Sequence, residues 1–154
     1  MNESRIEASA AGRRRGLLII WGAQLSTLLL LFFLTYVVRP EASRDGNHTL
    51  AWALGASGFM TFLASFLAKR KLLARALAER RLDIGTSAYI VAFALCEMTA
   101  ILGFVAYIIT GLSYALHSFI IAAGGILLHF PVRGVLDAIE AGGTANAHLN
   151  QTTL

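Results

Sequence analysis

The stretch GTSAYIVAFALCEMTAILGFVAYIIT, residues 85–110, decides the fold. At a rise of about 1.5 Å per residue, a helix of this length crosses the roughly 30 Å hydrocarbon layer of a bilayer. One acidic residue, Glu97, lies at its midpoint. An unpaired carboxylate at that depth costs at least about 2.5 kcal/mol. We therefore expect its side chain to be protonated, hydrogen-bonded or turned toward a protein-lined cavity.

The composition of the whole chain is also that of a membrane protein. Of its 154 residues, 56% are hydrophobic and 14% are charged, which is too apolar for an ordinary soluble domain. The formal net charge is +4, but the basic residues form short runs between apolar segments, which argues against nucleic-acid binding. The one cysteine, Cys96, has no partner for an internal disulfide, and we expect it to be a small buried apolar residue.

The apolar runs predict an all-α integral membrane fold. Four transmembrane helices are expected, over residues 17–38, 50–68, 85–110 and 114–130. The first run is longer than the core of a cleaved secretory signal, so we expect it to be retained. Three regions follow from this assignment: a basic N-terminal tail (1–16), a four-helix membrane domain (17–133) and a partly flexible C-terminal tail (134–154).

The lysines and arginines predict the orientation. Eleven of the thirteen lie in the N-terminal tail, in residues 69–84 or just after the fourth run, and two lie between the first and second runs. The positive-inside rule places both termini in the cytoplasm. We expect the bacterial inner membrane as the location. Helices two and three should extend into residues 69–84 and reverse tightly near 79–83, because no proline or glycine interrupts that segment. A short helix is expected near 135–141.

The second run carries small residues that allow close helix approach in lipid, and we expect Gly55, Ala56 and Gly58 to pack against another helix. If the hairpin of helices two and three is centred near residue 76 or 77, residues whose numbers add to about 153 lie level. That register places Glu97 beside Ala56 and Ser57, whose hydroxyl can bind the carboxyl group. No basic residue shares this depth in the four runs, so we expect a neutral acid.

The helix face around Glu97 resembles a known family. Residues 94–105, ALCEMTAILGFV, are similar to the carboxylate helix of the rotary ATPase proteolipids, whose subunit c pattern is Ala-Leu-x-Glu-x-x-Ala-Ile-x-Gly-x-Val. The resemblance extends over residues 50–110. It implies that Glu97 is the carboxylate that binds a proton or sodium ion, and the register above adds Ser57 to this expected ion site. It also implies close helix packing at Gly103, while Ala94 and Ala100 share the face of Glu97.

The chain also departs from that family. Two further helices flank the hairpin, and the carboxylate lies in the third helix where a four-helix proteolipid has it in the last. We therefore favour a non-catalytic subunit or assembly element of a membrane complex. The alternative is a proton- or sodium-translocating proteolipid in a homo-oligomeric ring.

Partners are expected to be the lipid bilayer and either further copies of the chain or other membrane subunits. No enzyme activity or cofactor is expected, because the sequence has no nucleotide loop, catalytic triad or metal-ligand cluster. His117 and His129 are expected at the membrane interfaces, too far apart for a joint metal site.

Overall fold

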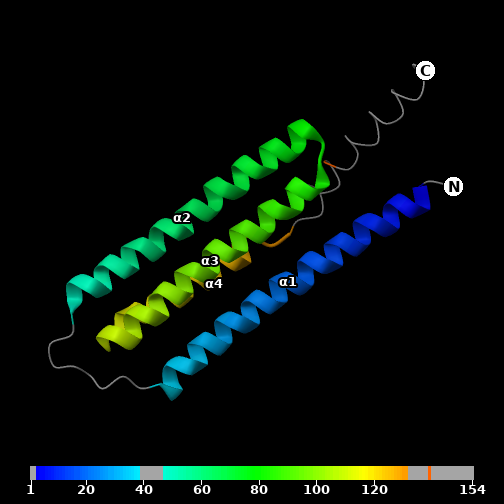
Figure 1. Ribbon diagram of the computed structural model, residues 1–154. Coiled ribbons are helices and arrows are strands. Elements are labelled where there is room, and N and C mark those ends of the chain that lie inside the picture. The colour runs from blue at the N-terminus through cyan, green and yellow to red at the C-terminus, as the bar shows by residue number, and fades with distance from the viewer. Residues whose placement is uncertain (1–2, 39–46, 132–138, 140–154) are drawn as a thin grey trace.

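The computed structural model describes residues 3–38, 47–131 and 139. Three helices within these ranges are long and apolar enough to cross a membrane. The elements are α1 (Glu3–Val37), α2 (His48–Glu79), α3 (Leu82–Thr110), the 3-10 helix η1 (Ser113–Leu116) and α4 (His117–Leu128). Figure 1 shows α3 and α4 between α1 and α2. The expected loop at 39–46 and most of the expected helix at 135–141 lie outside the described residues.

The first helix is longer than its apolar run. It begins at Glu3 and passes without a break through the alanine- and arginine-containing segment before Leu17. Alanine, arginine and glutamate are strong helix formers, and they outnumber Gly12 and Gly16 in this segment, which contains no proline. The basic N-terminal segment is therefore a continuation of α1.

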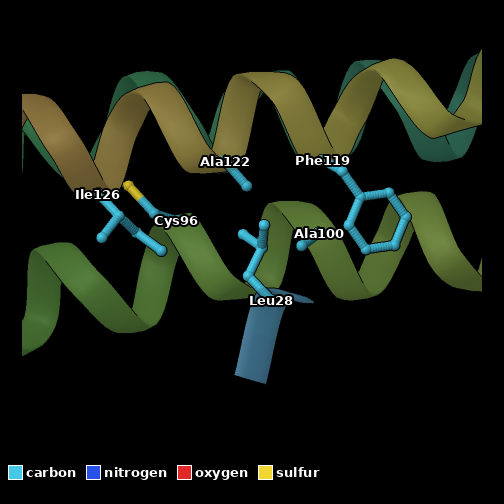
Figure 2. Close-up of a cluster of buried hydrophobic side chains, with 6 residues drawn as sticks. All are labelled: Leu28, Cys96, Ala100, Phe119, Ala122 and Ile126. Atoms are coloured by element: carbon cyan, nitrogen blue, oxygen red, sulfur yellow. The ribbon is translucent and has the colours of Figure 1, made fainter. Parts of the chain in front are cut away.

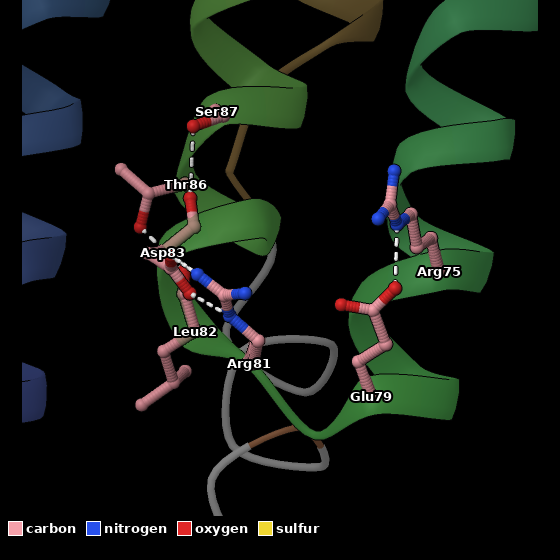
Figure 3. Close-up of polar contacts among 7 residues, drawn as sticks. All are labelled: Arg75, Glu79, Arg81, Leu82, Asp83, Thr86 and Ser87. Carbon is pink, nitrogen blue, oxygen red and sulfur yellow. Dashed lines mark hydrogen bonds and ion pairs between the residues drawn. The ribbon is translucent and has the colours of Figure 1, made fainter.

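The turn between α2 and α3 confirms the predicted tight reversal. Arg80 adopts a left-handed conformation (φ 53°), and the Arg81 amide donates to the Ala76 carbonyl oxygen at 3.0 Å. Arg81 then pairs with Asp83 at 2.6 Å (Figure 3). The hydrogen bond with Asp83, followed by its negative charge, raises the pKa of Arg81. The α2–α3 hairpin is thus closed by two residues and a short ion pair.

The core lies along the line where α1, α3 and α4 meet. Figure 2 shows its central cluster, which consists of Leu28, Cys96, Ala100, Phe119, Ala122 and Ile126. Cys96 is fully buried, as the sequence predicts. The outer faces remain strongly apolar, since Ile19, Trp52 and Ile120 are each about 70% exposed. Apolar side chains on the outside are what a lipid-facing surface requires, so the helices fit an integral membrane protein.

The fourth apolar run differs from its prediction. A continuous helix over residues 114–130 was expected, but the chain turns first as the 3-10 helix η1, and α4 ends at Leu128. Two glycines bring this helix close to its neighbours. A Cβ on Gly125 would lie 2.6 Å from Cys96 Sγ, and one on Gly103 would overlap the Ser118 side chain. This close approach lets a short helix pack tightly on α3.

Candidate functional site

Glu97 lies at one edge of the buried face of α3. Phe93, one turn before it, packs against Leu17 of α1, and Ala100, about one turn after it, belongs to the core cluster. Ala94 and Ile101 on its other flank are exposed. Glu97 itself is partly buried, and no hydrogen bond or ion pair joins it to another residue in the described ranges. The carboxyl group is therefore placed between α1 and the outer surface.

The structure does not bring Ser57 to Glu97. Ser57 is exposed, and its hydroxyl donates to the Ala53 carbonyl oxygen of its own helix at 2.9 Å. Thr99 is the α3 residue that faces α2, because it donates to the Gly58 carbonyl oxygen at 3.0 Å. Glu97 precedes Thr99 by two residues, which is about 200° around a helix. Its side chain therefore points away from α2.

The expected register of the hairpin was wrong, and the position of the turn explains why. A register centred near residue 76 or 77 places Thr99 beside Leu54, whereas Thr99 contacts Gly58 and lies 3.2 Å from Thr61, oxygen to oxygen. The helices reverse at residues 80–81, because α2 continues through the whole basic segment. When the turn moves along the chain by a few residues, the α2 residue that lies level with a given α3 residue changes by twice that number.

The six residues expected to pack helices together divide into two groups. Gly58, Ala100 and Gly103 are buried, with Gly58 against Thr99 and Gly103 against Ser118. The other three are Gly55, Ala56 and Ala94: the alanines are exposed, and a Cβ on Gly55 would have no heavy atom within 4 Å. The small face of α2 is thus only partly covered by this chain.

A groove of about 630 Å³ lies beside the uncovered part of that face. Trp52, Gly55 and Ala56 line it from α2, and Tyr114 and Ser118 line it from η1 and α4. The Tyr114 hydroxyl is buried and has no hydrogen-bond partner among the described residues. The groove is therefore apolar and open, with one unsatisfied hydroxyl near it.

Sequence reasoning missed a buried polar cluster where α2, α3 and the end of α4 meet. Ser65 Oγ lies 2.9 Å from His129 Nε2 and 3.7 Å from Cys96 Sγ. His129 is 1% exposed, so its side chain is enclosed by the protein itself. The available signal was a row of polar side chains one turn apart on α2, because Thr61, Ser65 and Lys69 share one face.

The hydrogen bonds of this cluster define what it can do chemically. The Ser65 hydroxyl donates its one proton to the Phe62 carbonyl oxygen at 2.6 Å. Cys96 Sγ and His129 Nε2 lie against the same hydroxyl oxygen. The cluster is therefore a hydrogen-bonded network that joins α3 and the end of α4 to α2.

No metal or family assignment emerges from these features. Within the described residues, no group of three His, Cys, Asp or Glu side chains could hold a metal ion. Comparisons with family models, with curated proteins and with solved structures give no match to the chain. The resemblance of residues 94–105 to the proteolipid helix therefore depends on those residues alone.

Proposed function

We propose that the chain is a non-catalytic subunit or assembly element of a membrane complex, in the inner membrane of a bacterium. In this proposal it crosses the membrane four times, with η1 and α4 forming the short fourth span and both termini in the cytoplasm. The excess of lysine and arginine in the N-terminal segment and around the α2–α3 turn supports that orientation. Three long apolar helices with apolar outer faces support the membrane location.

The groove beside Gly55 and Ala56 is the observation that carries the assembly role. In lipid, burial of apolar surface gives helices little reason to associate, so small residues that let backbones approach mark helix–helix contacts. Gly58 already serves such a contact with α3. Gly55 and Ala56 offer the same small surface but are not covered by this chain. A transmembrane helix of another chain would fill the groove.

The test is the native mass of the protein, extracted gently from its own membrane. A defined mass that includes foreign chains is expected, and Gly55→Leu should release the protein from them by filling the groove. Ala53→Leu is the matched control, because Ala53 is exposed on α2 about 200° from Gly55. A bare monomer in the wild type, or equal effects of both variants, would contradict the proposal.

The alternative, a proton- or sodium-carrying proteolipid, is favoured by the position of Glu97. A carrier carboxyl must reach a surface that faces another subunit, and a fourth helix folded over it would block that access. In the structure α4 packs on Cys96, Ala100 and Gly103 and leaves Glu97 partly exposed. The same mass measurement separates the two functions, because the carrier requires a closed ring of identical copies. In that case Glu97→Gln should abolish ion transport while leaving the ring intact.

A further inference from the structure

A buried amide oxygen on α1 lacks a partner. Three side-chain nitrogen or oxygen atoms are buried without a hydrogen bond among the described residues, and Gln24 Oε1 is one of them. Gln24 lies in the apolar part of α1, where water is not available to satisfy it. A buried unpaired amide oxygen is unfavourable, so a donor is expected nearby.

The packing of α1 turns Gln24 toward α3. Leu17, Ile20 and Leu28 form one stripe of α1, and Gln24 lies within it at helical spacing. Leu17 and Ile20 pack with the cluster around Phe93, and Leu28 packs in the central core cluster. The amide therefore lies at the α1–α3 interface.

The level of Gln24 on α1 corresponds to that of Glu97 on α3. The two helices run in parallel (Figure 1), and a pairing of Leu17 with Tyr89 and of Leu28 with Ala100, each within one core cluster, spans 11 residues on both helices. Gln24 lies between the two leucines, and Glu97 lies between their two partners. Glu97 also lies on the edge of α3 next to α1, because Phe93 is one turn before it. The amide and the carboxyl group thus lie at the same depth on adjoining faces.

We propose that Glu97 and Gln24 form a proton-binding pair between α1 and α3. The neutral carboxylic acid donates its proton to Gln24 Oε1, and Gln24 Nε2 donates to the acid's other oxygen. This exchange satisfies both groups and requires no counter-charge. It goes beyond the proposed function, since an assembly subunit and an ion carrier both need the carboxyl group satisfied at this depth.

No charged group competes for this position among the described residues. Of the basic side chains near this part of the core, Lys69 lies over the Tyr89 ring at 4.4 Å and His129 contacts Ser65. Arg14, whose Nε is buried without a hydrogen bond among the described residues, lies ten residues before Gln24 on α1, about 15 Å along the helix. Tyr89 lies about two turns from Glu97 toward the α2–α3 turn. On α4, Ala122 and Ile126 flank this level and carry no titratable group.

The proximity can be tested by disulfide formation in membranes. In a Cys96→Ala background, the pair Gln24→Cys and Glu97→Cys should cross-link rapidly under mild oxidation. The control pair Ser57→Cys and Glu97→Cys should not, because Ser57 lies on the opposite side of α3 from Glu97. Cross-linking that is absent in the first pair, or equal in both, would overturn the proposal.

The hydrogen bond itself can be tested by infrared spectroscopy of the full-length protein in lipid at neutral pH. A carbonyl band of a protonated carboxyl group is expected, and Glu97→Gln should remove it. Gln24→Leu should move the band to higher frequency, since the acid loses its acceptor. Thr27→Val is the control and should leave the band in place, because the Thr27 hydroxyl donates within α1 to Ala23.

An absent wild-type band, or a band that Gln24→Leu does not move, would refute the pair. The native mass is measured independently, so failure of the pair and failure of the assembly role can be told apart.

Discussion

The two sides of α3 place polar groups in the membrane region in different ways. Toward α2, Thr99 donates across the interface to Gly58 and contacts Thr61, and Cys96 donates to Ser65. Toward α1, Glu97 and the Gln24 amide oxygen have no partner among the described residues. A hydroxyl group can donate to a backbone carbonyl of its own helix, whereas the amide oxygen of Gln24 can only accept. The polar groups on the α2 side are therefore paired within the described part of the chain, and two on the α1 side are not.

The largest effect is expected where α4 closes the packed side of α3. Gly125→Val would place side-chain atoms on Cys96 Sγ and on the Phe62 ring, where even a Cβ lies 2.6 and 3.0 Å from them. Overpacking of this kind costs about 1–3 kcal/mol or more. The midpoint of unfolding in mild detergent should fall accordingly. Gly124→Val is the adjacent control and should fold normally, because no heavy atom lies within 4 Å of its Cβ position. Equal losses would show that helix propensity, and not contact with α3, sets the effect.

The next effect concerns the buried network around Ser65. Ser65→Ala leaves the buried Nε2 of His129 without its hydrogen-bond partner, and a buried unsatisfied polar group costs about 1–3 kcal/mol. The stability of the folded protein in detergent should fall by that amount. Ser57→Ala serves as the control on the same helix and should change nothing, since Ser57 is exposed and bonds within its own helix. A neutral Ser65→Ala variant would mean that His129 does not fasten α4 to α2.

A smaller effect is expected for the hydroxyl that sets the register. Thr99→Val keeps the shape of the side chain but removes the contacts with Gly58 and Thr61, together with the hydrogen bond to the Leu95 carbonyl oxygen within α3. Interhelical hydrogen bonds in membranes contribute about 0.6 kcal/mol on average, so the loss of stability should be near that value. Thr86→Val is the control, because the Thr86 hydroxyl donates only within α3. If the two variants behave alike, the cross-helix bonds contribute nothing measurable.

The difference between the two sides of α3 also shows which features can be predicted from the sequence. Hydropathy and charge predict the long helices, the α2–α3 reversal and the burial of Cys96, because each depends on a local stretch of chain. The partner of Glu97 depends on how α3 is rotated as well as on the register of the hairpin, because the face of α3 that meets α2 carries Thr99 and Glu97 lies about 200° from it. The burial of His129 was missed because it depends on Ser65, which is distant in sequence. The place of Gln24 depends on how α1 docks, and local periodicity does not contain that information.

The smallest effect is expected outside the membrane region, at the ion pair that follows the hairpin turn. Arg81 and Asp83 are both exposed, and exposed ion pairs contribute little because water and salt screen them. The hydrogen bond between them raises the pKa of Arg81 and lowers the pKa of Asp83, so both groups stay charged throughout the neutral pH range. The pair therefore cannot make stability depend on pH near neutrality.

Arg81→Ala should therefore leave the unfolding midpoint unchanged at every neutral pH and salt concentration. A clear, salt-sensitive loss would mean that the turn is an anchoring point, for instance to lipid head groups. The N-terminal end of α3 would then contribute to stability alongside the side of α3 that packs against α2.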